Sequence, residues 1–464
     1  MYEMVLKNGT IVTHSSSYRA DIGIQDGKIA VIAAPGAITE GVQVIDLKDK
    51  YILPGLVEPH MHINAYMNGI VDVLDHFTAS RCAAFGGVTT FLDFSEARKG
   101  CSVVEEIEKR IEQMSISCID YGMHAKFVEA NDDLLTQIRT IVDMGCPTIK
   151  MFMTYRKSGV MIDDVDILKI MKEAMKWGAR PGFHAESNAI AEYNDERNIA
   201  LGATTWMDFA LSKSAAAEEE AVQRVINYSE YTGCPIYIFH LTSKPGVKRI
   251  REAQEKGIQV YTETCPHYLC FTKEVYNRQD GNLFIMSPPL RDMEDQEALW
   301  GGLIDGTIGS IGSDNCTFTR EIKNQNLQKD SEGNYIQDYT KVINGCCGLE
   351  ERLSLLVGEG INKGRLTWNE LVEITSYNPA KVNGLYPMKG TIEVGSDADF
   401  AIIDPTKEVV LSKDTLHYPI DYSIYENRKA VGGLYMTIRR GEILVKDGEF
   451  FGKKGTGKFM KRTL

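Results

Sequence analysis

The chain has 464 residues, of which 43% are hydrophobic and 25% are charged, a balance that excludes disordered and collagen-like chains. Its formal net charge of −13 repels phosphate backbones, so we expect no binding to nucleic acid. The length accommodates one large domain and a smaller companion.

Residues 1–53 predict short strands separated by turns such as Asn8-Gly9 and Pro35-Gly36. The first of them lacks the apolar core of a secretion signal, and no apolar run approaches the length that crosses a bilayer. The ten cysteines are scattered, without a Cys-x-x-Cys pair, and this usage indicates reduced thiols. We therefore expect a cytoplasmic protein without a membrane segment.

Residues 54–385 alternate short β-rich runs with amphipathic helical stretches, of which residues 214–231 are the clearest. Strands that alternate with helices predict parallel pairing. The β-rich runs give eight candidate strands, near Leu56, Thr90, Tyr121, Ile149, Phe183, Ile238, Tyr261 and Ile311. Eight strand–helix repeats indicate a closed (β/α)8 barrel, with a doubly wound open sheet as the alternative.

After residue 385 the chain returns to short strands with glycine-rich turns. The last residues, 441–464, are basic and punctuated by glycine. Such a composition suits an arm that contacts an acidic surface, for example on another copy of this chain, and it is equally typical of a frayed tail.

The strongest chemical signal is the pair His60 and His62, which follows the run LPGLVEP. Alternate residues of a strand point to the same face, so both imidazoles can reach one metal ion. The alternative is a surface strand that carries two solvated imidazoles.

Four further polar residues close candidate strands, at the barrel end that carries functional groups: Lys150, His184, His240 and Asp314. A lone histidine at a strand end is more often a satisfied core residue, but six such groups from five strand ends are hard to reconcile with core packing. An ammonium group cannot bind a cation, so Lys150 fits a metal site only as a carbamate formed with carbon dioxide. A buried lysine paired with an acid is the alternative.

Longer motifs accompany these residues: KMFMTY, ETCPHYL, SPPLR, SDNCTF, NGCCGLEERL and NPAKVNGLYPMKGTIEVGSDADFAIID. Through them the chain resembles, nearly end to end, the dihydropyrimidinase/hydantoinase family of the amidohydrolase superfamily. The resemblance implies an α/β fold, with a (β/α)8 TIM barrel over residues 54–385 and a small β-sandwich formed by residues 1–53 and 386–440. It also implies a homotetramer, with residues 441–464 as a C-terminal arm.

The resemblance further implies two zinc ions per subunit, bridged by N6-carboxylysine at Lys150. Their ligands would fall into two groups, His60, His62 and Asp314 for one zinc, and His184 and His240 for the other. In the same way it assigns the substrate contacts: Tyr155 would hydrogen-bond the developing oxyanion, while Ser287 and Asn344 would hold the ureide edge, largely through backbone groups.

The reaction implied is zinc-dependent hydrolysis of the cyclic amide bond of a dihydropyrimidine or a 5-substituted hydantoin, which gives an N-carbamoyl amino acid. Two metals lower the pKa of a bridging water and polarise the ring carbonyl. Asp314 then carries the proton from the attacking hydroxide to the leaving nitrogen. Phe152, Tyr155 and residues 64–69 would form an apolar pocket for the exocyclic substituent of the ring, although ordinary packing explains Phe152 and the loop as well.

Two other functions stay open at this point. Arg291, or another cation facing the pocket, would favour an allantoinase or another cyclic-ureide amidohydrolase of purine breakdown. A metal-free scaffold on the same fold is the other possibility. Relative to the family, this chain has Asn315 for the usual histidine, Glu58 for aspartate, Ser187 for asparagine and Ile343 for proline. These differences affect the surroundings of the site, so the sequence does not fix the preferred ring or its stereochemistry.

Overall fold

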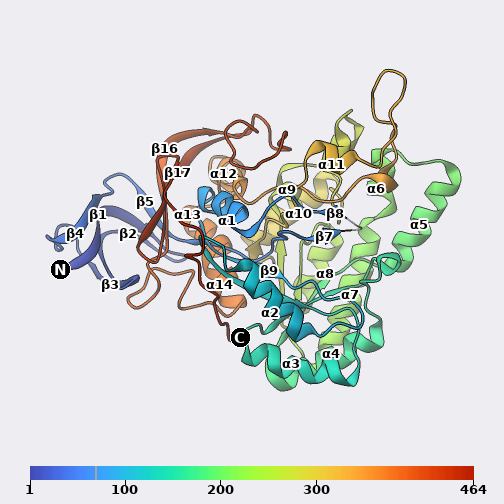
Figure 1. The fold of residues 1–464 in the computed structure, drawn as a ribbon, viewed down its shortest axis with the longest axis horizontal. Helices are drawn as coiled ribbons and strands as arrows, with labels where there is room; N and C mark the ends of the chain where they lie inside the picture. Colours follow the sequence, from blue (N-terminus) through green and yellow to red (C-terminus); the bar gives the residue numbers. More distant parts are fainter. Residues whose placement is uncertain (68–69) are drawn as a thin grey trace.

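The computed structural model describes residues 1–67 and 70–464. Figure 1 shows two parts, a barrel surrounded by helices and a sheet in which strands from both ends of the chain lie together. Among the described residues, no helix is long and apolar enough to cross a membrane.

Eight parallel strands form the barrel and follow one another in sequence order. Each of the eight predicted strands is confirmed: β6 (Leu56–Glu58), β9 (Val88–Phe94), β10 (Asp120–Lys126), β11 (Thr148–Phe152), β12 (Arg180–His184), β13 (Ile236–Ile238), β14 (Val260–Thr264) and β15 (Ser310–Ile311). Their residues are buried almost without exception, as expected for strands covered on both faces. This continuous apolar character is what made them recognisable in the sequence.

The barrel closes between the residues that follow β6 and those that follow β15. The His62 N–H donates to the Asn315 carbonyl at 2.8 Å, and the Asp314 N–H donates to the His60 carbonyl at 2.8 Å. These bonds join the first strand segment to the last, so the doubly wound open sheet is excluded.

The larger helices connect consecutive strands on the outside of the barrel (Figure 1). The predicted helix at 214–231 is α7; its apolar residues Ala221, Val222 and Val225 are buried, and Gly233 ends it with a left-handed φ of 71°. The helices are α1 (His76–Phe85), α2 (Val103–Met114), α3 (Asp132–Asp143), α4 (Asp164–Trp177), α5 (Asn188–Leu201), α6 (Trp206–Ser212), α7 (Ala215–Thr232), α8 (Lys244–Glu255), α9 (Pro266–Cys270), α10 (Met293–Ile304), α11 (Arg320–Asn324), α12 (Glu351–Leu356), α13 (Trp368–Val372) and α14 (Asn378–Val382).

The second part is a nine-stranded sheet with a hydrophobic core of its own, which includes Leu6, Ile52 and Ile402. Strand β5 from the N-terminal segment pairs antiparallel with β16 from the C-terminal segment, so the two chain ends build one unit, as predicted. Its strands are β1 (Tyr2–Val12), β2 (Ser17–Gln25), β3 (Lys28–Ala33), β4 (Gly41–Asp46), β5 (Tyr51–Pro54), β16 (Phe400–Val410), β17 (Lys429–Arg439), β18 (Glu442–Lys446) and β19 (Glu449–Phe450). A separate two-stranded ribbon joins β7 (Tyr66–Met67) to β8 (Ile70–Val71).

Residues 441–464, predicted as an arm, lie against their own chain. They first form β18 and β19 of the sheet and then run beside β10, where the Met460 N–H donates to the Tyr121 carbonyl at 2.7 Å. The side chain of Arg462 is buried and donates to the Thr148 hydroxyl at 2.8 Å and to the Asn383 carbonyl at 3.2 Å. This part of the tail therefore packs against the barrel of its own subunit, an outcome that its basic composition did not indicate.

A buried ion cluster joins the barrel to the sheet. The ammonium group of Lys389 lies 2.6 Å from Asp120 of β10, 2.9 Å from Asp397 and 2.7 Å from Asp399, all of them buried. Arg440 also pairs with Asp120, and Lys28 lies 2.6 Å from Asp397. Lys389, however, is the cation that contacts all three buried carboxylates and the ion-pair partner of Asp399, so its charge is needed to keep them in the interior.

We expect Lys389→Met to lower the free energy of unfolding by about 3–5 kcal/mol, because it leaves buried carboxylates without their central cation. Lys413→Met is the matched control, since Lys413 pairs with Asp414 at the surface, where the two side chains are 47% and 77% exposed. The control should leave the unfolding midpoint almost unchanged, because solvent screens an exposed ion pair. Denaturant unfolding of both variants measures the difference, and equal midpoints would contradict the role of the cluster.

Candidate metal centre

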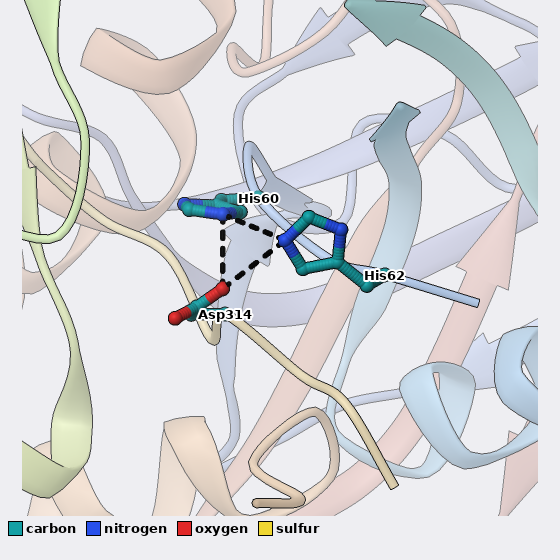
Figure 2. Close-up of side chains that lie close together, drawn as sticks. All are labelled: His60, His62 and Asp314. Atoms are coloured by element: carbon teal, nitrogen blue, oxygen red, sulfur yellow. Dashed lines mark hydrogen bonds and ion pairs between the residues drawn. The ribbon is translucent and has the colours of Figure 1, made fainter. Parts of the chain in front are cut away.

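Three of the predicted ligands meet at the carboxyl end of the barrel. Figure 2 shows the side chains of His60, His62 and Asp314 pointing toward one another. The Nε2 atoms of the two histidines lie 3.3 Å apart, and Asp314 Oδ1 lies 3.0 Å from His60 Nε2 and 3.3 Å from His62 Nε2. Ligands about 2.0 Å from a tetrahedral zinc ion are about 3.3 Å apart, so this donor set fits one such cation. His60 is fully buried, which excludes the surface-strand alternative for this pair.

A buried carboxylate holds the segments that carry these ligands. Glu58 accepts a hydrogen bond from the His60 N–H at 3.0 Å and another from the Ser313 N–H at 2.9 Å. Arg352 lies 3.3 Å from Glu58 and donates to the Val57 carbonyl at 3.1 Å and to the Ile311 carbonyl at 2.6 Å. Glu58 and Arg352 thus fix the first and last strands to each other beside the ligand cluster.

Three of the predicted site residues have left-handed backbone conformations. The φ angles are 66° for Tyr155, 38° for His240 and 48° for Asp314. Such conformations cost residues with a Cβ about 1–3 kcal/mol each and persist where the surrounding structure imposes them. Here they turn these three side chains toward the cavity.

His184 and His240 lie beside the first cluster. Their ring centroids are 4.4 Å apart, and the rings of His60 and His240 are 5.4 Å apart. Burial lowers the pKa of His184 and holds that of His240 well below the usual range. Neutral imidazoles keep a lone pair for a metal, so these two histidines could form a second ligand group next to the first.

Neighbouring charges shift the pKa values of two members of the first ligand cluster, His60 and Asp314. Burial opposes protonation of His60, but Asp314 and Glu263 outweigh it and raise the pKa of His60 to about 9. Burial alone would raise the pKa of Asp314; the adjacent His60 and His62 hold it well below the usual range. Without a cation, a proton on His60 therefore balances the carboxylates, and a bound metal would replace that proton.

Lys150 lies in the middle of β11, lines the same cavity and is buried. Among the described residues it forms no ion pair; its ammonium group lies 3.8 Å from the ring centroid of Phe239 and 5.0 Å from that of Phe152. The acid partner required by the alternative interpretation is thus missing from the described part of the chain. Burial lowers the pKa of Lys150 to about 7, so a large fraction of the amine is neutral near neutral pH.

Two carboxylates next to the ligands were not predicted. Glu263, at the end of β14, accepts from His60 Nδ1, and the Tyr237 hydroxyl donates to Glu263 at 2.8 Å. Glu186 lies 2.6 Å from His184 Nε2. Glu263 closes a β-rich run in the same way as the predicted ligands do, so the same signal could have identified it. Both carboxylates orient a histidine ring through the nitrogen that faces away from the other ligands.

A cavity of about 960 Å³ opens above these residues. The predicted substrate residues Tyr155, Ser287 and Asn344 all line it, together with the predicted ligands except His60. Phe152, Ala65 and Tyr66 contribute apolar surface, whereas residues 68–69 of the predicted loop lie outside the described residues. The site residues chosen from the sequence are therefore brought together around one cavity.

The cavity also carries a cation that was not predicted. Lys213 lines it, with its ammonium group 3.8 Å from Glu186 and 4.8 Å from the ring centroid of Tyr155. Arg291 does not line the cavity; it donates to the Thr242 hydroxyl at 2.9 Å and to the Lys213 carbonyl. Burial raises the pKa of Tyr155, so its phenol keeps the proton that it can donate.

Known proteins match this chain over almost its full length. A model of the Amidohydrolase family matches residues 51–444. A D-hydantoinase from Ralstonia pickettii is 36% identical over 99% of both chains, and one from Geobacillus stearothermophilus is 38% identical over 99% of this chain and 96% of its own. The crystal structure of a dihydropyrimidinase from Brevibacillus agri superposes with a TM-score of 0.94 at 35% identity and covers 99% of this chain and 98% of its own.

The contact between Glu263 and His60 yields a prediction about metal affinity. We expect Glu263→Gln to weaken zinc binding about 10–100-fold, because the neutral amide no longer fixes the His60 ring or raises its basicity. Tyr237→Phe is the control, since it removes one bond to Glu263 and leaves the carboxylate on His60. Competition with a chelator measures both affinities, and a Glu263→Gln variant that binds zinc as tightly as the control would contradict this role.

Proposed function

This chain belongs to the hydantoinase family of the amidohydrolase superfamily and is a cyclic amidohydrolase, and from this premise we propose that it opens the ring of dihydropyrimidines or 5-substituted hydantoins to give N-carbamoyl amino acids. The observation that carries the proposal is the shared cavity, in which His62 and Asp314 of the three-residue cluster line the wall together with the predicted substrate contacts. Zinc as the metal and a homotetrameric assembly belong to the same proposal and rest on the family resemblance, and a cytoplasmic location belongs to it on the grounds of cysteine usage.

In this proposal the donors divide between two cations. His60, His62 and Asp314 would hold one, and His184 and His240 would hold the other. The fit is supported by the spacing of the first three donor atoms and by the buried Nδ1 of His240, which has no hydrogen-bond partner among the described residues. When bound, two such cations supply a water of lowered pKa and polarise the ring carbonyl.

Lys150 would join the two ligand groups as N6-carboxylysine. Its neutral amine adds carbon dioxide, forming a nitrogen–carbon bond and releasing a proton, and this converts a neutral group into an anion. The change suits the position of Lys150, because an ammonium group would repel the cations and a carbamate would attract them. The environment of three aromatic rings, those of Phe94, Phe152 and Phe239, keeps bulk water away from the group.

The remaining side chains would bind the ring and move the proton. The backbone groups of Ser287 and Asn344 would hold the ureide edge, and the Tyr155 hydroxyl would donate a hydrogen bond to the oxygen that gains negative charge. Asp314 would accept a proton from the attacking water and pass it to the ring nitrogen as the carbon–nitrogen bond breaks. One water is consumed, and the products of the opened bond are a carboxylate and a carbamoyl group.

A second candidate substrate has an observation in its favour. The ammonium group of Lys213 faces the cavity, so a ring with a polar substituent, such as allantoin, finds a cation there. The apolar surface of Phe152, Ala65 and Tyr66 favours hydantoins with apolar substituents instead. A substrate comparison separates the two.

We expect the purified chain, supplied with zinc and bicarbonate, to open dihydrouracil, hydantoin or 5-phenylhydantoin faster than allantoin, with N-carbamoyl products identified by mass spectrometry. Asp314→Asn should keep most of its metal through the other five ligands and lose turnover by at least ~100-fold, as expected for a group that transfers protons. Absence of ring opening with every substrate would overturn the proposed function. If added zinc restored normal turnover to Asp314→Asn, the aspartate would be a ligand only.

We expect Lys150→Ala to abolish loading of two metals and nearly all turnover, because the anion between the ligand groups is lost. Short carboxylic acids such as acetate should restore part of the activity by occupying the vacated volume. Lys126→Ala is the matched control: Lys126 lines the same cavity but pairs with Glu96 at 3.1 Å, so both metals should stay bound. Metal analysis and turnover measure the outcome, and full activity of Lys150→Ala without added acid would show that no carbamate is needed.

A further inference from the structure

Two segments that are far apart in sequence supply the predicted ureide contacts. One ends at Ser287 and the other is centred on Asn344, and both line the cavity. The Gly345 N–H donates to the Ile285 carbonyl at 3.1 Å, so the two segments lie side by side. Their relative position determines whether the backbone groups of Ser287 and Asn344 can reach one ring.

A single buried lysine binds both segments. The ammonium group of Lys323, in α11, donates to the carbonyls of Ile285 at 2.8 Å, Ile343 at 2.9 Å and Gly345 at 2.7 Å. An ammonium group has three hydrogens, and all of them are used here. Lys323 is fully buried and forms no ion pair among the described residues, so the three carbonyl dipoles are what stabilises its charge.

The backbone of the same lysine adds a fourth contact. The Ile343 N–H donates to the Lys323 carbonyl at 3.1 Å, so both polar groups of Ile343 are bound to one residue. Helix α11 is itself anchored, because the Thr319 side chain caps it and Asn324 accepts from Asn282 at 2.6 Å. The lysine therefore presents its ammonium group from a fixed base.

The ammonium charge of Lys323 acts on the peptide group that joins Ile343 to Asn344. The carbonyl of Ile343 and the N–H of Asn344 belong to one peptide group. A cation on the carbonyl oxygen polarises that peptide and strengthens its N–H as a donor. The Asn344 N–H has no acceptor among the described residues, and Asn344 lines the cavity.

We propose that Lys323 is a positioning residue for ureide recognition, which fixes the Ser287 and Asn344 segments in register and strengthens the Asn344 N–H toward a carbonyl oxygen of the ring. This inference rests on the proposed function. Lys323 touches neither the ring nor the metal ligands, so its effect reaches the reaction through substrate binding. Burial lowers the pKa of Lys323 to about 8, and the group keeps its charge at neutral pH.

The test compares Lys323→Met, which has no donor, with Lys323→Gln, which has two. We expect KM for the best ring substrate to rise about tenfold or more for methionine, with kcat and metal content changing far less, because one charged hydrogen bond is worth about that factor. Lys323→Gln should give a KM between those of the wild-type chain and Lys323→Met. If Lys323→Met does not fold, the KM of Lys323→Gln is the value that tests the proposal. Lys341→Met, on an exposed lysine of the same region, is the control and should match the wild-type chain.

Amide hydrogen exchange gives a readout that needs no substrate. Peptides covering residues 285–290 and 339–347 should exchange faster in Lys323→Met than in the control, and peptides of the barrel strands should not change. A folded, metal-loaded Lys323→Met with wild-type KM and wild-type exchange would overturn the role of Lys323. Failure of the wild-type chain to open any cyclic ureide would overturn the proposed function instead, so the two failures are distinguishable.

Discussion

Closure of the barrel is the constraint on which the rest of the structure depends. The hydrogen bonds that join His60 and His62 to residues 314 and 315 bring together two parts of the chain that are separated by the whole barrel. The same contacts set the spacing of the imidazole and carboxylate atoms in Figure 2. The buried ion pair of Glu58 and Arg352 lies beside this junction and holds the first and last strand segments together. A ligand cluster built across the junction is therefore as rigid as the barrel itself.

The backbone conformations and buried charges of the site residues lower the stability of the folded chain, and contacts with neighbouring residues offset part of this loss. Left-handed backbone at Asp314 and His240 is unfavourable, and so is burial of several imidazoles and carboxylates in one place. Hydrogen bonds from His60 to Glu263 and from His184 to Glu186 offset part of this cost, and the first of them leaves His60 Nε2 directed toward His62 and Asp314. The protein thus holds electron-pair donors close together before any cation arrives, so little reorganisation is needed when one binds.

The sequence was informative where a local pattern has one structural meaning. β-rich runs marked all eight barrel strands, and a polar residue closing such a run marked Lys150, His184 and Asp314. It was uninformative where a role depends on partners distant in sequence. Lys323 lies in a polar stretch that resembles any exposed turn of helix, and only the folded chain places three carbonyls around it. Arg462 is similar: the basic composition of its tail was compatible with an arm against another copy of the chain or with a frayed tail, and only the folded chain shows this side chain buried, with a hydrogen bond to the Thr148 hydroxyl.

Two of the positions at which the sequence was found to differ from the family, 343 and 315, form hydrogen bonds near the Asn344 segment. Ile343 stands where proline is frequent, and its N–H donates to the Lys323 carbonyl, a bond that proline cannot make. Asn315 replaces the usual histidine, and its side-chain oxygen accepts from the Gly348 N–H at 3.3 Å and from the Thr317 hydroxyl at 3.1 Å. Both residues therefore tie the Asn344 segment to the structure that follows β15. Recognition of a ring through backbone groups depends on where that segment lies, and this chain fixes its position with contacts of its own.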